Sequence, residues 1–166
     1  MLIIEQLDIK SGGRWRDIRL AALRDAPDAF GSTLVDAETR SLKFWSKQLE
    51  QLPTFVAVLD GVDAGVARGA RDTETSDTAF LLSMWVAPTA RGRGLGGALI
   101  SAVTNWAIAQ GLSRLVLDVA DINAPAIVLY KRKGFVATGE TGALPVPREH
   151  ITEHRMAMNL IAQAEK

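Results

Sequence analysis

The segment FLLSMWVAPTARGRGLGG, residues 80–97, constrains the fold of this chain more than any other. It is typical of an apolar strand, a turn marked by Pro88, and a glycine-rich loop that opens a helix near Leu95. Four glycines within residues 92–97 leave backbone N–H groups accessible, and the N-terminus of the following helix adds partial positive charge. The segment therefore predicts a cradle for an anion such as a pyrophosphate.

Two nucleotide-binding motifs fit this loop incompletely. A Walker-type loop is excluded, because Ala and Leu at residues 98–99 stand where Lys and Ser/Thr are required. Residues 92–97 do satisfy G-x-G-x-x-G, and Asp118 ends a strand-like run about 20 residues later, as a ribose-binding acid should. However, residues 87–91 separate the strand from the glycines, which should follow it directly. An NAD(P)-binding oxidoreductase domain that uses glycines 92–97 therefore remains an alternative.

Three motifs resemble those of the GNAT N-acetyltransferase superfamily. Residues 91–96, RGRGLG, match its R/Q-x-x-G-x-G/A signature, and residues 84–88 resemble its strand and following proline. Residues 123–135, NAPAIVLYKRKGF, resemble its N-x-x-A-x-x-L-Y-x-x-x-G-F block. Because these motifs occur in the family's order and spacing over residues 80–135, the chain is identified as a member of this superfamily.

The composition is that of one ordinary globular domain, and we expect residues 1–166 to form a single N-acetyltransferase domain. The 19 Lys and Arg residues balance 19 Asp and Glu, so no net charge favours nucleic acid or an anionic membrane. The chain has no Cys, which excludes disulfides, thiolate zinc sites and a cysteine nucleophile; we expect no metal. Residues 1–10 lack the pattern of a signal peptide. We therefore expect a cytoplasmic monomer or homodimer without nucleic-acid or membrane partners.

Apolar periodicity and turn residues predict alternating strands and helices along the chain. A helix capped by Asn123 should end at Gly134, and Asp60-Gly61 should turn a hairpin. The predicted strands are 1–8, 54–59, 64–71, 78–86, 113–119, 135–140 and 155–160, and the predicted helices are 14–25, 35–52, 95–110 and 123–133.

The resemblance implies an α+β (mixed α/β) fold. Its GNAT-like sheet is twisted, mostly antiparallel and of about seven strands, flanked by about four helices. The two central strands, residues 78–86 and 113–119, are parallel and splay apart. A splayed pair leaves backbone N–H and C=O groups that an amide-bearing ligand can satisfy.

The resemblance also implies acetyl-CoA as co-substrate. Its pantetheine arm should pair with the backbone of the strand at Met84, Trp85 and Val86. Asn123 should bind cofactor, cap its helix, or do both. The pyrophosphate should lie on the main-chain amides of Arg91, Gly92, Arg93, Gly94, Leu95, Gly96 and Gly97.

Tyr130 and Asp118 are the candidate catalytic residues. Tyr130 resembles the family's general acid, and a phenol of pKa about 10 can protonate a thiolate whose parent thiol lies near 8.5. Asp118 precedes Tyr130 by 12 residues, the spacing of the base glutamate in ribosomal-protein N-terminal acetyltransferases. The shorter Asp retracts the carboxylate by about one C–C bond, a gap that a bridging water fills. Alternatively, Asp118 is a strand-end charge that reaches solvent, and the base is Glu38 or a group within residues 149–154.

The acceptor site is implied between residues 25–38 and the loop at 141–154. Phe30 offers an apolar contact, Gly31 a hinge, and Glu38 a charge that holds a cation. The resemblance thus predicts transfer of an acetyl group from acetyl-CoA to a primary amine of a small molecule, an amino acid or a peptide N-terminus. A non-catalytic acyl-CoA-binding module is a further alternative.

Overall fold

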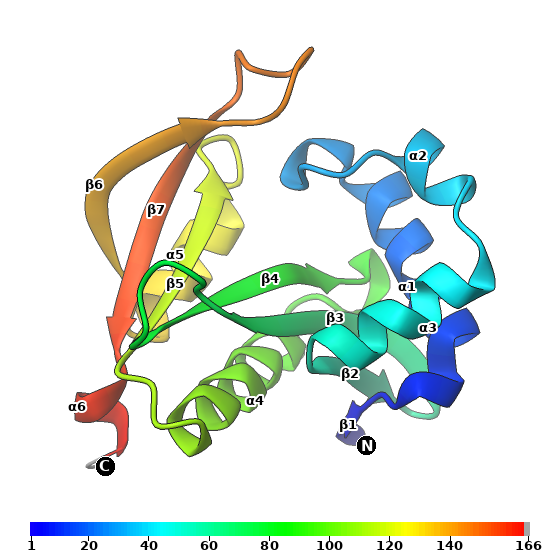
Figure 1. Ribbon diagram of the computed structural model, residues 1–166, viewed down its shortest axis with the longest axis horizontal. Coiled ribbons are helices and arrows are strands. Elements are labelled where there is room, and N and C mark those ends of the chain that lie inside the picture. Colours follow the sequence, from blue (N-terminus) through cyan, green and yellow to red (C-terminus); the bar gives the residue numbers. More distant parts are fainter. Residues whose placement is uncertain (165–166) are drawn as a thin grey trace.

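The computed structural model describes residues 1–164 as one seven-stranded sheet with helices on both faces (Figure 1). The strand order is β1-β2-β3-β4-β5-β7-β6, and only β4 and β5 are parallel neighbours. This arrangement confirms the predicted mixed, mostly antiparallel sheet. The strands are β1 (Leu2–Gln6), β2 (Thr54–Leu59), β3 (Val62–Arg71), β4 (Thr78–Val86), β5 (Arg114–Ala120), β6 (Val136–Ala143) and β7 (Thr152–Asn159).

The structure contains six α-helices within residues 1–164, two more than predicted. They are α1 (Gly12–Asp25), α2 (Leu34–Glu38), α3 (Leu42–Gln51), α4 (Leu95–Ala109), α5 (Ala124–Arg132) and α6 (Leu160–Ala164). Short 3-10 turns precede α1, follow α1 and follow β4. The short helix α6 was not predicted, because residues 155–160 were expected to form the last strand and no element was expected after it.

The helix predicted over 35–52 is wrong as a single element, because it is broken between α2 and α3. The Thr39 hydroxyl donates to the carbonyl oxygen of Asp36 at 2.7 Å and closes α2. The Ser41 hydroxyl then accepts from the N–H of Phe44 at 3.2 Å and caps α3. Hydroxyl side chains that bond to nearby backbone favour helix ends over helix interiors, which explains the break.

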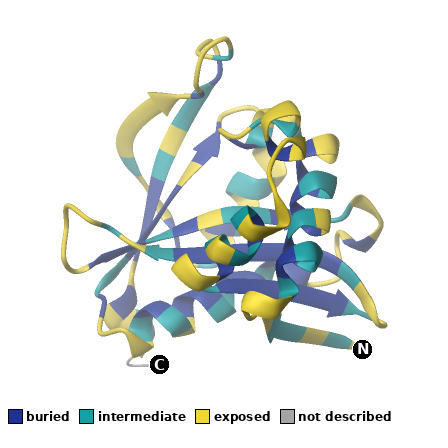
Figure 2. Cartoon of the chain, turned by 45° about the vertical axis from the view of Figure 1, so that its right-hand side comes forward, coloured by how far each residue is buried: buried dark blue, intermediate teal, exposed yellow. Residues whose placement is uncertain are grey.

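Two hydrophobic cores lie on opposite faces of the sheet. On one face α4 packs with Leu99 and Val103 against strand residues such as Leu115 and Leu117. On the other face α1 and α3 form a second core, to which Trp15 contributes. The central strands are buried along most of their length, whereas β6 is largely exposed (Figure 2).

The parallel pair β4–β5 separates soon after it forms. Pairing runs only from Thr78 opposite Arg114 to Phe80 opposite Val116. Beyond that point the two strands diverge (Figure 1), and Ser83, with φ of 57°, shifts the β3–β4 register. Residues 81–86 of β4 therefore have no strand partner on this side, which confirms the predicted splay.

Candidate active site

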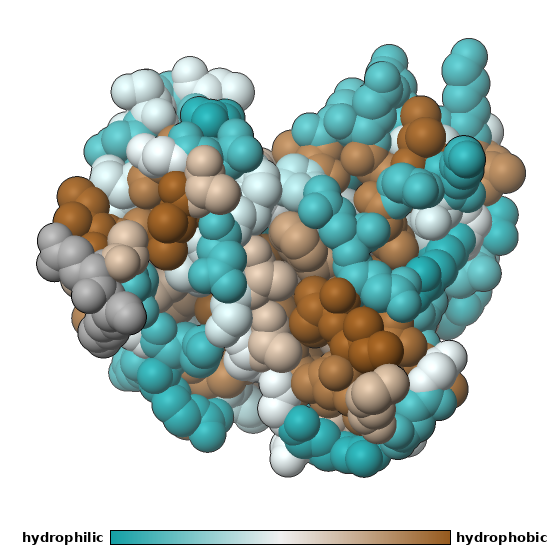
Figure 3. Space-filling model, turned by 90° about the horizontal axis from the view of Figure 1, so that it is seen from below, coloured by the Kyte–Doolittle hydropathy of each residue, from teal (hydrophilic) through white to brown (hydrophobic). Residues whose placement is uncertain are grey.

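A cavity of about 880 Å³ opens where β4 and β5 have separated. Its lining comes from four stretches of the chain, 25–30, 84–86, 90–97 and 120–133. Seen from below, the molecule is notched between the side that carries β6 and β7 and the side that carries α1 to α3 (Figure 3). Segments far apart in the sequence thus meet at the splayed end of the sheet.

The glycine loop has the backbone shape of an anion cradle. Gly92 and Gly94 have φ of 78° and 87°, in the left-handed region, and a Cβ added to either would meet nothing within 4 Å. These two glycines are therefore required by the backbone conformation, and the space next to them is open. A Cβ on Gly96 would lie 2.7 Å from Cδ2 of Leu129, so this glycine allows α4 to pack against α5. At the start of α4 the first-turn N–H groups have no acceptor within the helix.

Three cationic side chains line the cavity near this loop: Arg91, Arg132 and Lys133. Arg91 donates from Nε to the carbonyl oxygen of Val86 at 3.1 Å, and Lys133 donates to Ser101 Oγ at 3.0 Å. Arg93 does not line it and lies 3.9 Å from Asp60 instead. Arg132 and Lys133 were missed from the sequence, although both stand in the block that contains Tyr130.

Tyr130 lies on α5 with its side chain buried, and it lines the cavity. Its ring packs edge-on against Phe135, with the ring centroids 5.7 Å apart. Burial raises the pKa of the Tyr130 hydroxyl above its usual value, so the phenol is neutral at physiological pH. A neutral phenol in a cavity is a proton donor.

Asn123 also lines the cavity and stands at the predicted N-cap position of α5, but its side chain does not cap the helix. Its backbone has φ of −95° and ψ of 64°, outside the extended region of an N-cap residue, and its side chain makes no capping hydrogen bond. The Asn123 N–H donates to the carbonyl oxygen of Ala120 at 3.0 Å. Its side-chain amide is therefore available to a ligand.

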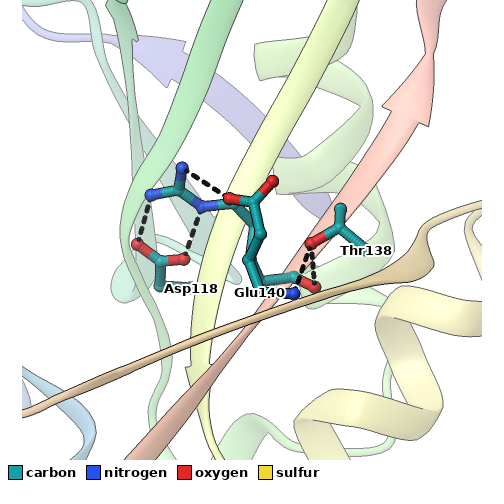
Figure 4. Close-up of polar contacts among 4 residues, drawn as sticks. Asp118, Thr138 and Glu140 are labelled. Carbon is teal, nitrogen blue, oxygen red and sulfur yellow. Dashed lines mark hydrogen bonds and ion pairs between the residues drawn. The ribbon is translucent and has the colours of Figure 1, made fainter.

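Asp118 is held by Arg155 of β7, which lies opposite it in the sheet (Figure 4). Arg155 donates from Nε and Nη2 to the two Asp118 carboxylate oxygens at 3.0 and 3.2 Å, and from Nη1 to Glu140 at 3.4 Å. Hydrogen bonding to Asp118 raises the pKa of Arg155. Asp118 does not line the cavity, but Ala120, two residues further along the same face of β5, does.

Glu153 is a second carboxylate on this face, opposite Ala120. Burial, aided by the charge of Asp118, raises the pKa of Glu153. The sequence did not distinguish Glu153 from other acidic residues, because its position depends on the β5–β7 register.

Only one of the three residues predicted to bind the acceptor lies at the cavity. Phe30 is buried and lines the cavity, whereas Gly31 and Glu38 do not line it. Arg148, from the loop between β6 and β7, donates to the carbonyl oxygens of Pro27, Phe30 and Gly31 at 2.6, 2.9 and 3.0 Å. This guanidinium therefore fixes the loop that carries Phe30.

Asp25, at the end of α1, ties that helix to the end of β4 and to the glycine loop. Its Oδ2 accepts from Trp85 Nε1 at 3.0 Å and from Arg91 Nη2 at 2.5 Å. Asp25 lines the cavity together with both partners. The sequence indicated Trp85 and Arg91 but not the carboxylate that orients them.

Residues 15–135 match the model of the Acetyltransferase (GNAT) family, a span of more than half of the chain. The chain belongs to the GNAT family. Among curated relatives, a streptothricin acetyltransferase of Streptomyces lavendulae is 35% identical over 64% of this chain and 57% of its own. An L-2,4-diaminobutyric acid acetyltransferase of Nocardia farcinica is 32% identical over 66% of this chain and 60% of its own. The matched region thus spans about three-fifths of these two curated relatives.

Solved GNAT structures share the fold. The structure of yncA, a putative acetyltransferase from Salmonella typhimurium with its cofactor acetyl-CoA, has a TM-score of 0.74 at 25% identity, covering 96% of this chain and 94% of its own. The family and these acetyltransferase relatives support acetyl-CoA-dependent N-acetyl transfer rather than the dinucleotide alternative. Within residues 1–164, no helix is long and apolar enough to cross a membrane.

Proposed function

We propose that this GNAT protein transfers the acetyl group of acetyl-CoA to a primary amine of a small molecule. The observation that carries the proposal is that one cavity, of about 880 Å³, joins the glycine cradle, the unpaired edge of β4 and the buried Tyr130. Relatives named for streptothricin and diaminobutyric acid support a small-molecule acceptor.

The residues present fit acetyl-CoA as the co-substrate. Pyrophosphate oxygens are suited to the amides of residues 92–97, which supply both donors and the helix dipole, and Arg91, Arg132 and Lys133 add positive charge. The main chain of Met84–Val86 is suited to the amides of the pantetheine arm, since it lies beyond the last β4–β5 pair. The side-chain amide of Asn123 offers a further hydrogen bond.

The proposed chemistry is attack of the amine nitrogen on the thioester carbonyl carbon. A C–N bond forms and the C–S bond breaks, while the nitrogen loses one proton and the departing sulfur gains one. Tyr130 is the proposed donor to sulfur, because it is buried, neutral and in the cavity. The products are the amide and the thiol, and Tyr130 is reprotonated from solvent.

Asp118 is the proposed acceptor of the amine proton, through a water. The support is its position on the cavity face of β5 and the two hydrogen bonds by which Arg155 orients its carboxylate. A base whose orientation is fixed by a third group follows the usual logic of catalytic pairs. Glu153, opposite Ala120, is the alternative acceptor on the same face.

The test is thiol release from acetyl-CoA with a panel of amines, amino acids and short peptides, alongside binding of CoA and NADH. We expect turnover with at least one small amine, and CoA binding that quenches the fluorescence of Trp85. Tight CoA binding without turnover on any amine would identify the non-catalytic module instead. Binding of NADH but not CoA would restore the oxidoreductase alternative.

A further inference from the structure

Two arginines are buried between α1 and the sheet. Arg19 of α1 is 8% exposed and Arg68 of β3 is 6% exposed. Arg68 is partly satisfied: Nε donates to Thr54 Oγ1 at 2.9 Å, and Nη2 donates to the carbonyl oxygen of Gln48 at 2.6 Å. Its Cζ also lies 4.9 Å from the centre of a Trp15 ring. Arg68 is therefore held in place by neutral groups only.

Arg19 is less well satisfied. Its Cζ lies 4.5 Å above the centre of the Phe30 ring, and Nη1 is buried without a hydrogen-bond partner in the described part of the chain. Among residues 1–164, neither Arg19 nor Arg68 forms an ion pair with a carboxylate. Buried charges are normally paired, so two guanidinium groups without an anion are an exception that needs an explanation.

The electrostatics of the pair favour an incoming anion. Burial lowers the pKa of Arg19 to about 10 and that of Arg68 to about 10, and the charge of Arg19 adds to the effect on Arg68. Both groups remain protonated at neutral pH. A planar guanidinium with free N–H donors matches the two oxygens of a carboxylate.

Neither arginine lines the cavity itself, but Arg19 lies one residue away from it. Phe30 connects Arg19 to the cavity, since its ring stacks on Arg19 and the residue also lines the cavity. Leu82, which lies opposite Arg68 in the β3–β4 register, is 38% exposed although β4 is a central strand. This face of β4 therefore carries a partly exposed side chain beside Arg68.

We propose that Arg19, supported by Arg68, binds an anionic group of the acceptor, so that the preferred acceptor is an amine that also carries a carboxylate. This inference rests on the proposed N-acetyl transfer and specifies its substrate class. Arg19 acts as a specificity residue: it contributes to acceptor binding and leaves acetyl-CoA binding unchanged.

The first test compares amino acids with the amines formed by removing their carboxylate. Suitable pairs are L-2,4-diaminobutyrate with 1,3-diaminopropane, lysine with cadaverine, and phenylalanine with phenethylamine. For wild type we expect kcat/KM at least 10-fold higher for the carboxylate member of the best pair. Arg19→Gln should reduce this ratio to below about 3 without changing the KM for acetyl-CoA. Equal kcat/KM values within every pair for wild type would overturn the inference.

The matched control is Arg16→Gln on the same helix. The Arg16 side chain is 41% exposed and pairs with its neighbour Asp17 at 3.1 Å. This variant should retain the full preference for the carboxylate. Loss of the preference to the same extent in Arg16→Gln would show a general charge effect and would contradict a specific site. Taurine and O-phosphoethanolamine, in place of an amino acid, report whether the site accepts other oxyanions.

The second test does not depend on turnover. Replacing an unpaired buried charge by an apolar side chain is neutral or stabilising, so Arg19→Met should melt at or above the wild-type temperature without ligand. Added amino acid should raise the wild-type melting temperature by about 2 °C or more over its decarboxylated partner, and Arg19→Met should lose this difference. If Arg19→Met does not fold, Arg19→Lys replaces it in this test. We then expect a smaller difference in melting temperature between the amino acid and its decarboxylated partner than in wild type.

The outcomes separate the two proposals. Carboxylate-dependent stabilisation that Arg19→Met abolishes, with no turnover on any amine, would support the anion site and reject the transferase function. Turnover without any carboxylate preference would support the transferase and overturn the anion site. A less stable Arg19 variant that keeps the wild-type carboxylate preference would make Arg19 a structural residue, which also overturns the inference.

Discussion

The proposed cofactor side of the cavity is built mainly from one continuous stretch, residues 84–97, and most of its proposed binding groups are main-chain amides and carbonyls, to which α5 and its ends add the side chains of Asn123, Arg132 and Lys133. The acceptor side is built from side chains on separate segments: Phe30 after α1, Arg148 between β6 and β7, and Asp118 with Arg155 on β5 and β7. A main-chain site tolerates changes of side chain as long as the glycines keep its shape. A side-chain site changes with each substitution. One fold can thus keep the same acetyl donor, acetyl-CoA, while the amine that accepts the acetyl group varies.

The largest expected effect lies between the two sides, at Tyr130. Tyr130→Phe keeps the ring contact with Phe135 and removes only the proton donor, so kcat should fall about 10²- to 10⁴-fold while the KM for acetyl-CoA stays constant. Because burial raises the pKa of Tyr130, the hydroxyl stays protonated across pH 6–9 and the loss should be the same at each pH. Steady-state kinetics over this range check the prediction. A normal kcat with rate-limiting chemistry would reduce Tyr130 to a packing residue.

The second effect concerns the base. Asp118→Asn should lower kcat/KM about 10²-fold at pH 6, because the amine acceptor is then largely protonated. The loss should shrink above the amine's own pKa, near 8 for an α-amine and about 10.4 for a lysine side chain, where free base is abundant. Asp118→Glu should keep substantial activity. The measurement is the pH–rate profile with one good acceptor.

Glu140→Gln is the matched control, since Glu140 bonds to the same arginine but lies on the edge strand β6, two strands from β5. It should leave the pH–rate profile unchanged. Parallel profiles for wild type and Asp118→Asn would show that Asp118 is a structural charge and would transfer the base role to Glu153.

The third effect tests the main-chain side. Gly94→Ala should weaken acetyl-CoA binding about 10-fold, because a left-handed residue with φ of 87° becomes strained and the cradle shifts. Gly111→Ala is the control: Gly111 has φ of 76° with equal space around it, but stands past the opposite end of α4. Both variants should lose about 1 kcal/mol of stability, and only Gly94→Ala should lose affinity in calorimetric titration. Equal loss of affinity in both would mean that the loop contributes only stability.

The smallest expected effect is at Arg148. Lysine keeps the charge but has one nitrogen in place of Nη1 and Nη2, which reach these carbonyls from two positions, so Arg148→Lys should raise the acceptor KM roughly 3- to 10-fold. The KM for acetyl-CoA should not change, because Arg148 bonds to the loop at residues 27–31 and not to the glycine loop. A parallel rise in both KM values would contradict the separation of the two sides.

The same division explains what the sequence predicted. The glycine loop, the Asp60-Gly61 turn and Tyr130 are encoded by neighbouring residues, and the structure places each where it was expected. Arg148 bonds to Phe30 across 118 residues of sequence, and Arg155 reaches Asp118 across 37. No local pattern reports such contacts, because they depend on strand register and loop packing.

Two local predictions were also wrong for local reasons. Hydroxyl side chains at Thr39 and Ser41 ended one helix and began another inside an apolar pattern that continues across the break. Asn123 is a residue type that favours the N-cap position and stands there, but its backbone angles lie outside the extended region and its side chain makes no capping hydrogen bond. In both cases short-range hydrogen bonding overrode what periodicity or residue type favoured.

The most direct test of the main-chain cradle is an amide chemical-shift titration of the ¹⁵N-labelled protein with CoA and, separately, NADH. We expect CoA to shift the amides of residues 84–86 and 91–97 most strongly, while those of residues 72–77, in the β3–β4 turn at the opposite end of β4, stay fixed. NADH should shift none of them. CoA-induced shifts concentrated outside residues 84–97, or a larger response to NADH, would contradict this expectation.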